Sequence, residues 1–209
     1  MNGAGSWAWP ALFLLGAYHG LNPGMGWLFA VALGMQERRR GAVAWSLVPI
    51  TVGHALAVAV AIAAAGVLRI VVSLGHLKLI VAAALFAFGG YRLIRHRHPK
   101  GGGMRVGFRD LTLWSFLMAS AHGAGLMVLP VLFGVSAGEH AGHSAGIQSL
   151  SSASLAVGIH TGGYLAVTAL VAAIVYEKVG LAVLRTAWVN MDLMWAGALV
   201  LTGLLTLLI

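Results

Sequence analysis

Long apolar stretches, separated by short polar segments, run along the whole chain. A helix that crosses a bilayer needs about 20 mainly apolar residues, so these stretches predict six membrane-spanning helices. We expect the helices at about 9–35, 44–68, 77–91, 111–135, 153–176 and 188–209. The main polar segments between them are 36–41, 92–110, 136–152 and 177–185. The pattern therefore predicts an all-α integral membrane protein.

The composition supports this class. The chain has 209 residues, of which 60% are hydrophobic and only 9% charged, and its mean hydropathy is +0.91. A soluble domain carries about 25% charged residues. Cysteine is absent, which excludes disulfides, thiolate metal sites and redox-active pairs. We expect no cleaved signal peptide, because Met1–Pro10 contains no basic residue and the first apolar stretch is too long.

The basic residues predict how the helices are oriented. In a six-span topology, Arg69 and Lys78 fall on one side of the membrane. The remaining lysines and arginines fall on the other side: Arg38, Arg39, Arg40, Arg92, Arg95, Arg97, Lys100, Arg105, Arg109, Lys178 and Arg185. Loops rich in Lys and Arg stay in the cytoplasm. We therefore expect a multi-pass protein of the cell (inner) membrane with both termini outside the cytoplasm. The net charge of +8 does not indicate nucleic-acid binding, because it lies in these loops.

Histidines near the middle of the predicted spans are the main candidates for a functional site. They are His19, His54, His122 and His160, in the first, second, fourth and fifth spans. A polar side chain at that depth is costly and marks a functional site. Imidazole is a common metal ligand that suits Zn, Cu, Fe and Ni. A hydrogen bond between helices explains any one of these residues, but the matched set predicts a shared transition-metal site.

The same histidines suggest an internal repeat. His19-Gly20 corresponds to His122-Gly123, and His54 corresponds to His160. With three spans in each half, the second half is inverted relative to the first, as in transporters that bind substrate at the repeat interface. We predict residues 1–95 as the first three-helix repeat, 96–110 as a basic cytoplasmic linker and 111–209 as the second three-helix repeat.

An irregular segment, His19–Gly26, interrupts the first predicted span. Pro23 has no N–H to donate and disfavours helix at Asn22. Irregular backbone at membrane depth faces protein or a water-filled cavity, so we expect this segment to line a substrate path. Asn22 is either a ligand or the cap of a following half-helix. Met25 is either a soft ligand or a packing residue, and Met127 has the same two interpretations.

Carboxylates are absent from the centre of every predicted span. Asp110, Glu177 and Asp192 lie near cytoplasmic ends, and Glu139 lies in an outer loop. Hard cations such as Mg²⁺ and Ca²⁺ require carboxylate oxygens, so the pattern argues against them. Whether the outer loop with Glu139, His140 and His143 captures a metal is left open by the sequence.

These motifs resemble those of the LysE/NicO superfamily of six-span transporters. The segment His19–Met25 is similar to the His-x-x-Asp-x-Asp-His motif of the NicO-like nickel and cobalt branch. It keeps the first histidine but has Asn22 and Gly24 for the aspartates and Met25 for the last histidine; Gly53-His54 resembles the second-helix pair. Pro23-Gly24, Arg38–Gly41 and Gly53 resemble the LysE/RhtB-like amino-acid exporters. The likeness covers mainly residues 15–66 and implies a transporter for a soft ion or another small solute.

We therefore expect a membrane transporter for a transition-metal ion, whose identity the sequence leaves open. The expected metal ligands are His19, His54, His122 and His160, with Asn22 and Met25 assisting. The alternatives are an exporter of amino acids or similar amino compounds, and a non-transporting membrane subunit whose histidines bind a cofactor or partner. The chain lacks H-E-x-x-H, a cysteine nucleophile and a phosphate-binding loop, so we do not expect an enzyme. The expected partners are the lipid bilayer and the ion or solute, and the sequence leaves open whether the chain forms a homo-oligomer.

Overall fold

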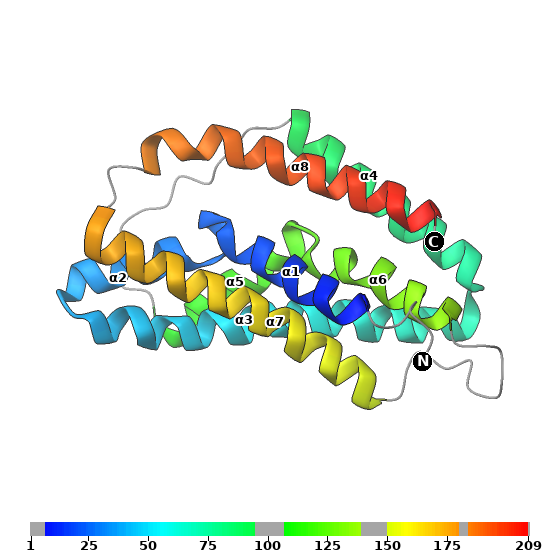
Figure 1. The fold of residues 1–209 in the computed structure, drawn as a ribbon, viewed down its shortest axis with the longest axis horizontal. Coiled ribbons are helices and arrows are strands. Elements are labelled where there is room, and N and C mark those ends of the chain that lie inside the picture. The colour runs from blue at the N-terminus through cyan, green and yellow to red at the C-terminus, as the bar shows by residue number, and fades with distance from the viewer. Residues whose placement is uncertain (1–6, 95–106, 139–149, 180–183, 209) are drawn as a thin grey trace.

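A computed structural model describes residues 7–94, 107–138, 150–179 and 184–208 of the chain (Figure 1). The helices are α1 (Ala8–Leu21), a 3-10 turn η1 (Pro23–Met25), α2 (Trp27–Glu37), α3 (Arg40–Val71), α4 (Leu74–Ile94), α5 (Phe108–Ala121), α6 (Ala124–Gly138), α7 (Leu150–Ile174), a π-helical turn η2 (Val175–Val179) and α8 (Leu184–Leu208). Within those ranges the chain forms helices and no strands, which confirms the all-α class.

Three of these helices are long and apolar enough to cross a membrane: Arg40–Val71, Leu74–Tyr91 and Ser151–Lys178. A fourth span results if α5 and α6, which are bent by 55° relative to each other, count as one. A shorter apolar helical stretch covers Ala196–Leu208. The described ranges therefore show three or four of the six predicted membrane-spanning helices. Most of the expected linker 96–110 lies outside the described residues, as does the loop with Glu139, His140 and His143.

The first predicted span is two helices rather than one, because the segment between α1 and α2 turns sharply. Asn22 has an extended backbone, and its Oδ1 accepts a hydrogen bond of 2.9 Å from the Gly24 N–H. Gly26 has φ of 144°, which residues with a Cβ rarely adopt. A Cβ there would also lie 2.3 Å from Ile50 Cγ2. This turn therefore requires glycine at position 26.

The fourth predicted span is also broken. α5 ends at Ala121, its C-cap is His122, and Gly123 has φ of 72°. α1 and α5 are both 14 residues long, and the C-cap of α1 is Asn22. His122 is therefore the C-cap of its helix, as Asn22 is, whereas His19 lies inside α1. In both His19 and His122, however, Nδ1 donates to the carbonyl oxygen four residues earlier, at 2.7 Å, so their expected equivalence stays a prediction.

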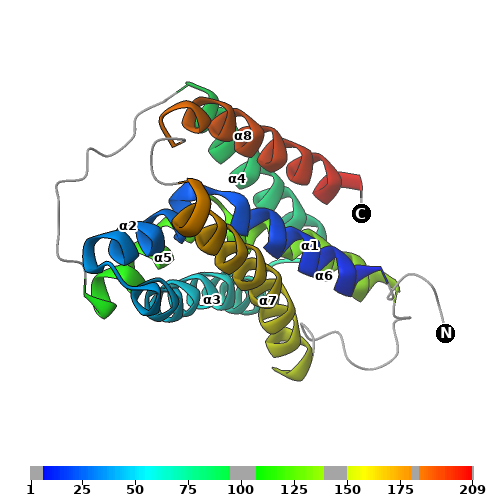
Figure 2. The same cartoon turned by 60° about the vertical axis from the view of Figure 1, so that its left-hand side comes forward.

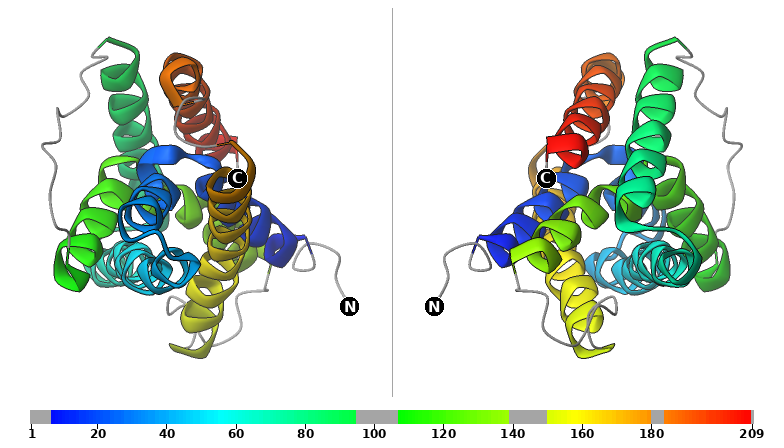
Figure 3. Two further views of the ribbon diagram at one scale, coloured as in Figure 1. Left: turned by 90° about the vertical axis from the view of Figure 1, so that its left-hand side faces the viewer. Right: turned by 90° about the vertical axis from the view of Figure 1, so that its right-hand side faces the viewer.

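Helices from one half of the chain pack against helices from the other half, an arrangement that we call the exchanged packing (Figures 1 and 2). α1 packs against α7, and α5 packs against α3, while α4 and α8 lie side by side and both contact α6 (Figure 3). Glycines allow two of these contacts to be close. A Cβ on Gly16 would lie 1.9 Å from the His160 carbonyl oxygen, and one on Gly53 would lie 2.2 Å from the Thr112 carbonyl oxygen.

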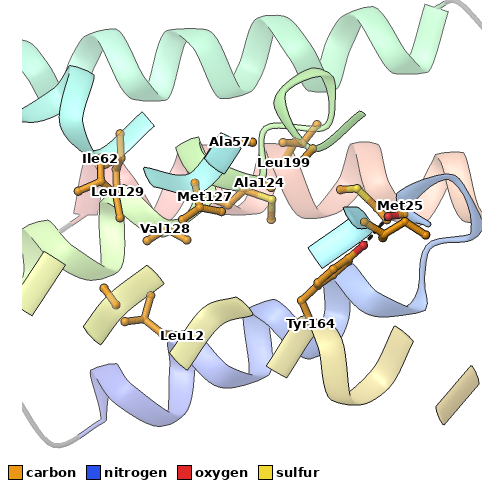
Figure 4. Packing of buried hydrophobic residues seen from close by; sticks show 14 of the residues in the cluster. Leu12, Met25, Ala57, Ile62, Ala124, Met127, Val128, Leu129, Tyr164 and Leu199 are labelled. Atoms are coloured by element: carbon orange, nitrogen blue, oxygen red, sulfur yellow. Dashed lines mark hydrogen bonds between the residues drawn. The ribbon is translucent and has the colours of Figure 1, made fainter. Parts of the chain in front are cut away.

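The apolar core lies between these helices and includes Leu12, Met25, Met127 and Tyr164 (Figure 4). Large apolar side chains also cover the outside of the bundle, for example Leu14, Trp45, Val60 and Ile70. Such a surface suits lipid, because it exposes apolar side chains along whole helices rather than in one small patch.

Replacing Gly26 with alanine should destabilise the protein by about 2–4 kcal/mol, the sum of an unfavourable backbone conformation and overpacking against Ile50. Thermal unfolding in detergent measures the change. The matched control is Gly90→Ala in α4, where an added Cβ meets nothing within 4 Å and alanine favours the helix. Equal melting temperatures for the two variants would contradict the role given to Gly26.

Candidate functional site

Three of the predicted histidines meet in the interior, and each comes from a different helix: His19 from α1, His54 from α3 and His160 from α7. Their ring centroids are 5.8 Å apart for His19 and His54, 5.1 Å for His19 and His160, and 5.4 Å for His54 and His160. All three side chains are fully buried. We call these three residues the histidine cluster.

Backbone carbonyls of α1 set the tautomers of two members of the histidine cluster. His19 Nδ1 lies 2.7 Å from the Leu15 oxygen, and His160 Nδ1 lies 3.2 Å from the Leu12 oxygen. A carbonyl oxygen only accepts, so in both residues Nδ1 carries the proton and donates it. Nε2 then keeps its lone pair in both rings. This is the arrangement that metal-ligating histidines use, with the second nitrogen bound to a carbonyl.

His54 differs from the other two members. Both of its ring nitrogens are buried, and neither has a hydrogen-bond partner within the described part of the chain. Its ring is instead stacked on Tyr164 at a centroid distance of 3.8 Å and an angle of 3°. A buried polar group without a partner costs about 1–3 kcal/mol. The histidine cluster therefore retains unused hydrogen-bonding or ligand capacity at its centre.

Tyr164 belongs to the site although the sequence did not identify it. It is fully buried, and its hydroxyl donates a hydrogen bond of 2.5 Å to the Met25 carbonyl (dashed in Figure 4). The only sequence signal was its spacing, because Tyr164 follows His160 by one helical turn and so lies on the same face of α7. Tyr164 thus connects the histidine cluster to the α1–α2 break.

The structure places the other predicted site residues close to the breaks. The side-chain oxygen of Asn22 accepts a hydrogen bond from the Gly24 N–H, so Asn22 is a cap, although it caps the short turn η1 and not α2. Met25 and Met127 are almost fully buried in the apolar core. His122 lies at the α5–α6 break, where its Nδ1 donates to the Met118 oxygen over 2.7 Å. The ring contacts of the histidine cluster thus join three of the four predicted histidines, while His122 is held at the break.

The arrangement is a set of donors rather than a formed metal centre. No group of three or more His, Cys, Asp or Glu side chains within the described ranges is arranged to hold a metal ion. The ring of His54 is nearly parallel to that of His160, at 9°, and lies flat on Tyr164. A metal lies in the plane of an imidazole ligand, so His54 has to turn before all three rings can bind one ion.

Acidic side chains with described positions lie at the ends of helices, away from this interior. Glu37 pairs with Arg39, and Glu177 pairs with Arg40 at 3.3 Å. Asp110 accepts a hydrogen bond from the Gly107 N–H at the start of α5. The positions of Asp110 and Glu177 agree with the sequence analysis, and the side chains of Asp192 and Glu139 lie outside the described residues. The histidine cluster is accordingly built from neutral donors.

Comparison of the chain with models of known protein families, with curated proteins and with solved structures gives no match.

Replacing His54 with phenylalanine should stabilise the protein by about 1–3 kcal/mol, because it keeps a flat ring on Tyr164 and removes two buried nitrogens without partners. His54→Ala is the paired variant and should destabilise by about 2–4 kcal/mol through the cavity that it leaves. Thermal unfolding of both variants in the same detergent gives the comparison. A phenylalanine variant as unstable as the alanine variant would show that the His54 nitrogens make hydrogen bonds that stabilise the fold.

Proposed function

We propose that the protein is a membrane transporter that moves a small soft cation, a transition-metal ion, through the histidine cluster. The observation that carries this proposal is the pair of Nδ1–H bonds to the Leu15 and Leu12 carbonyls, which leaves Nε2 of His19 and His160 as lone-pair donors. Turning His54 would add a third nitrogen donor.

Six spans in two inverted repeats remain our proposal for the topology. α1 and α2 would form one broken span, and α5 and α6 a second one, while α3, α4, α7 and α8 would each cross singly. The exchanged packing supports a two-fold relation: α1 of the first half packs on α7 of the second, and α5 of the second half packs on α3 of the first. In transporters with this plan, one half rocks against the other around a central site.

The chemistry of the site favours a soft ion. The donors are neutral imidazoles, and the acidic groups in the described ranges lie at helix ends. A hard divalent ion would keep its full charge in a buried site without carboxylates, which is costly. Imidazole nitrogen and thioether sulfur, which Met25 carries, suit ions such as Cu(I) and Ag(I) or, less favourably, Zn²⁺. The carbonyl end of α1, at the break, also attracts positive charge. His122, held at the second break, is our candidate for a further ligand along the path.

Silver(I) should raise the melting temperature of the purified protein, because an ion at 100 times its dissociation constant stabilises the folded state by about 2.7 kcal/mol. His160→Ala removes one donor and should abolish this shift. The matched control is His76→Ala, since His76 lies exposed on α4 and should leave the shift unchanged.

If silver(I) raises the melting temperature equally in the native, His160→Ala and His76→Ala proteins, the ion binds outside the histidine cluster and the proposal is contradicted. Zinc and nickel, tested in parallel, rank the ions that the histidine cluster accepts. A Soret band in the purified protein would instead indicate a haem-binding subunit.

A further inference from the structure

We propose that Tyr164 is a positioning residue that holds the α1–α2 break closed while the histidine cluster is empty and releases it when His54 turns to bind a cargo. The inference rests on the proposed transport function for its biological meaning. The contacts that carry it do not depend on which cargo is bound.

Tyr164 contacts the two parts that it would connect. One face of its ring lies on His54, at 3.8 Å between centroids and nearly parallel. Its hydroxyl donates to the Met25 carbonyl inside the turn, and a Cβ added to Gly26 would lie 3.1 Å from the same hydroxyl oxygen. Tyr164 is fully buried, so water does not compete for either contact. A change at His54 is therefore transmitted directly to the turn.

The histidine cluster is closed off in this structure, and one wall has to move for a cargo to enter. Each of its three side chains has no exposed surface, and the residues from Asn22 to Gly26 are buried as well. The turn has few backbone hydrogen bonds of its own. Its own bonds are Met25 N–H to the Asn22 oxygen at 3.0 Å and Gly26 N–H to the Pro23 oxygen at 3.4 Å. A segment with so few bonds opens more readily than the helices around it.

Cargo binding at His54 conflicts with the stacked arrangement. The nitrogens of His54 point along the plane of a ring that lies flat on Tyr164 and nearly parallel to His160. To share an ion with Nε2 of His19 and His160, the ring has to rotate out of that plane, which ends the stacking. Tyr164 then loses the contact that holds its ring, and its bond to Met25 weakens. A ligand shifts a conformation only through contacts that differ between two states, and the stack supplies that difference.

The absence of cysteine from the native chain permits a direct test. Met25→Cys places one buried thiol in the turn, and its rate of modification by a water-soluble methanethiosulfonate reports how often the turn opens. Adding Tyr164→Phe removes the hydroxyl and keeps the ring, so the rate should rise about threefold to tenfold, the equivalent of one buried hydrogen bond. Tyr91→Phe is the matched control, because Tyr91 lies exposed on α4, and it should leave the rate unchanged.

A rate that stays within twofold of the Met25→Cys parent in the Tyr164→Phe chain would overturn the proposal. If that chain does not fold, the His54 variants decide the question in the Met25→Cys background. His54→Ala removes the stack and should raise the rate, whereas His54→Phe preserves a flat ring and should not. Equal rates in these two variants would equally overturn it.

Hydrogen–deuterium exchange then separates this inference from the transport proposal. Silver(I) should speed exchange in a peptide covering residues 19–28 of the native chain but not in peptides from α4, and Tyr164→Phe should show the faster exchange without silver. If silver neither binds nor changes exchange, the transport proposal fails while the labelling rates still test the role of Tyr164. If silver binds and the exchange of residues 19–28 does not change, Tyr164 does not couple the two parts, and the inference is wrong.

Discussion

The site depends on the close approach of α1 to α7 at Gly16. A Cβ on Gly16 would lie 1.9 Å from the His160 carbonyl oxygen, and a Cβ on Gly163 would lie 2.1 Å from the Phe13 carbonyl oxygen. Because both crossing points are glycines, the backbone of α7 lies directly on that of α1. That contact brings His160 within reach of the Leu12 carbonyl and places Tyr164 against the turn. Side chains at these glycines would separate the helices and with them the donors of the histidine cluster.

Buried polar groups without hydrogen-bond partners lower the stability of this fold. An interior of apolar residues would avoid that loss. His54 has two buried nitrogens without hydrogen bonds in the described part of the chain. His160 Nε2 is also buried there without a hydrogen bond. Apolar residues at those positions would pack the interior at lower cost. Sites that bind a ligand commonly retain such destabilising groups, because activity and stability compete there. The interrupted helices are a second cost of the same kind, since continuous helices would satisfy more backbone groups.

Much of this architecture could be predicted from the sequence, because helical apolar stretches and helix-breaking residues are local properties. The all-α class, three or four apolar helices long enough to cross a membrane, and the irregular segment around Pro23 follow from local patterns, and the structure confirms them. The capping role of Asn22 follows from its place before Pro23. The grouping of His19, His54 and His160 was also predicted, because polar residues at similar depth in a membrane tend to face one another.

The remainder depends on register and packing, which short motifs do not determine. His122 was paired with His19 on the strength of a two-residue pattern. His122 caps the end of α5 whereas His19 lies inside α1, so that pattern alone does not determine the register of the predicted repeat. The close contact of α7 with α1 lies at Gly163 and not at the neighbouring Gly162, where an added Cβ would meet nothing within 4 Å. Tyr164 was missed because a tyrosine in an apolar helix has no local signature that distinguishes a site residue from a packing residue.

X-ray absorption spectroscopy at the metal edge of the protein loaded with one equivalent of silver(I) or copper(I) tests the central claim most directly. The account predicts a first shell dominated by nitrogen at imidazole distances, with the outer-shell scattering of two or three histidine rings, and a loss of one ring in the His160→Ala protein. A first shell of oxygen ligands without imidazole scattering, or a spectrum unchanged in His160→Ala, would contradict the assignment of the histidine cluster as the cargo site.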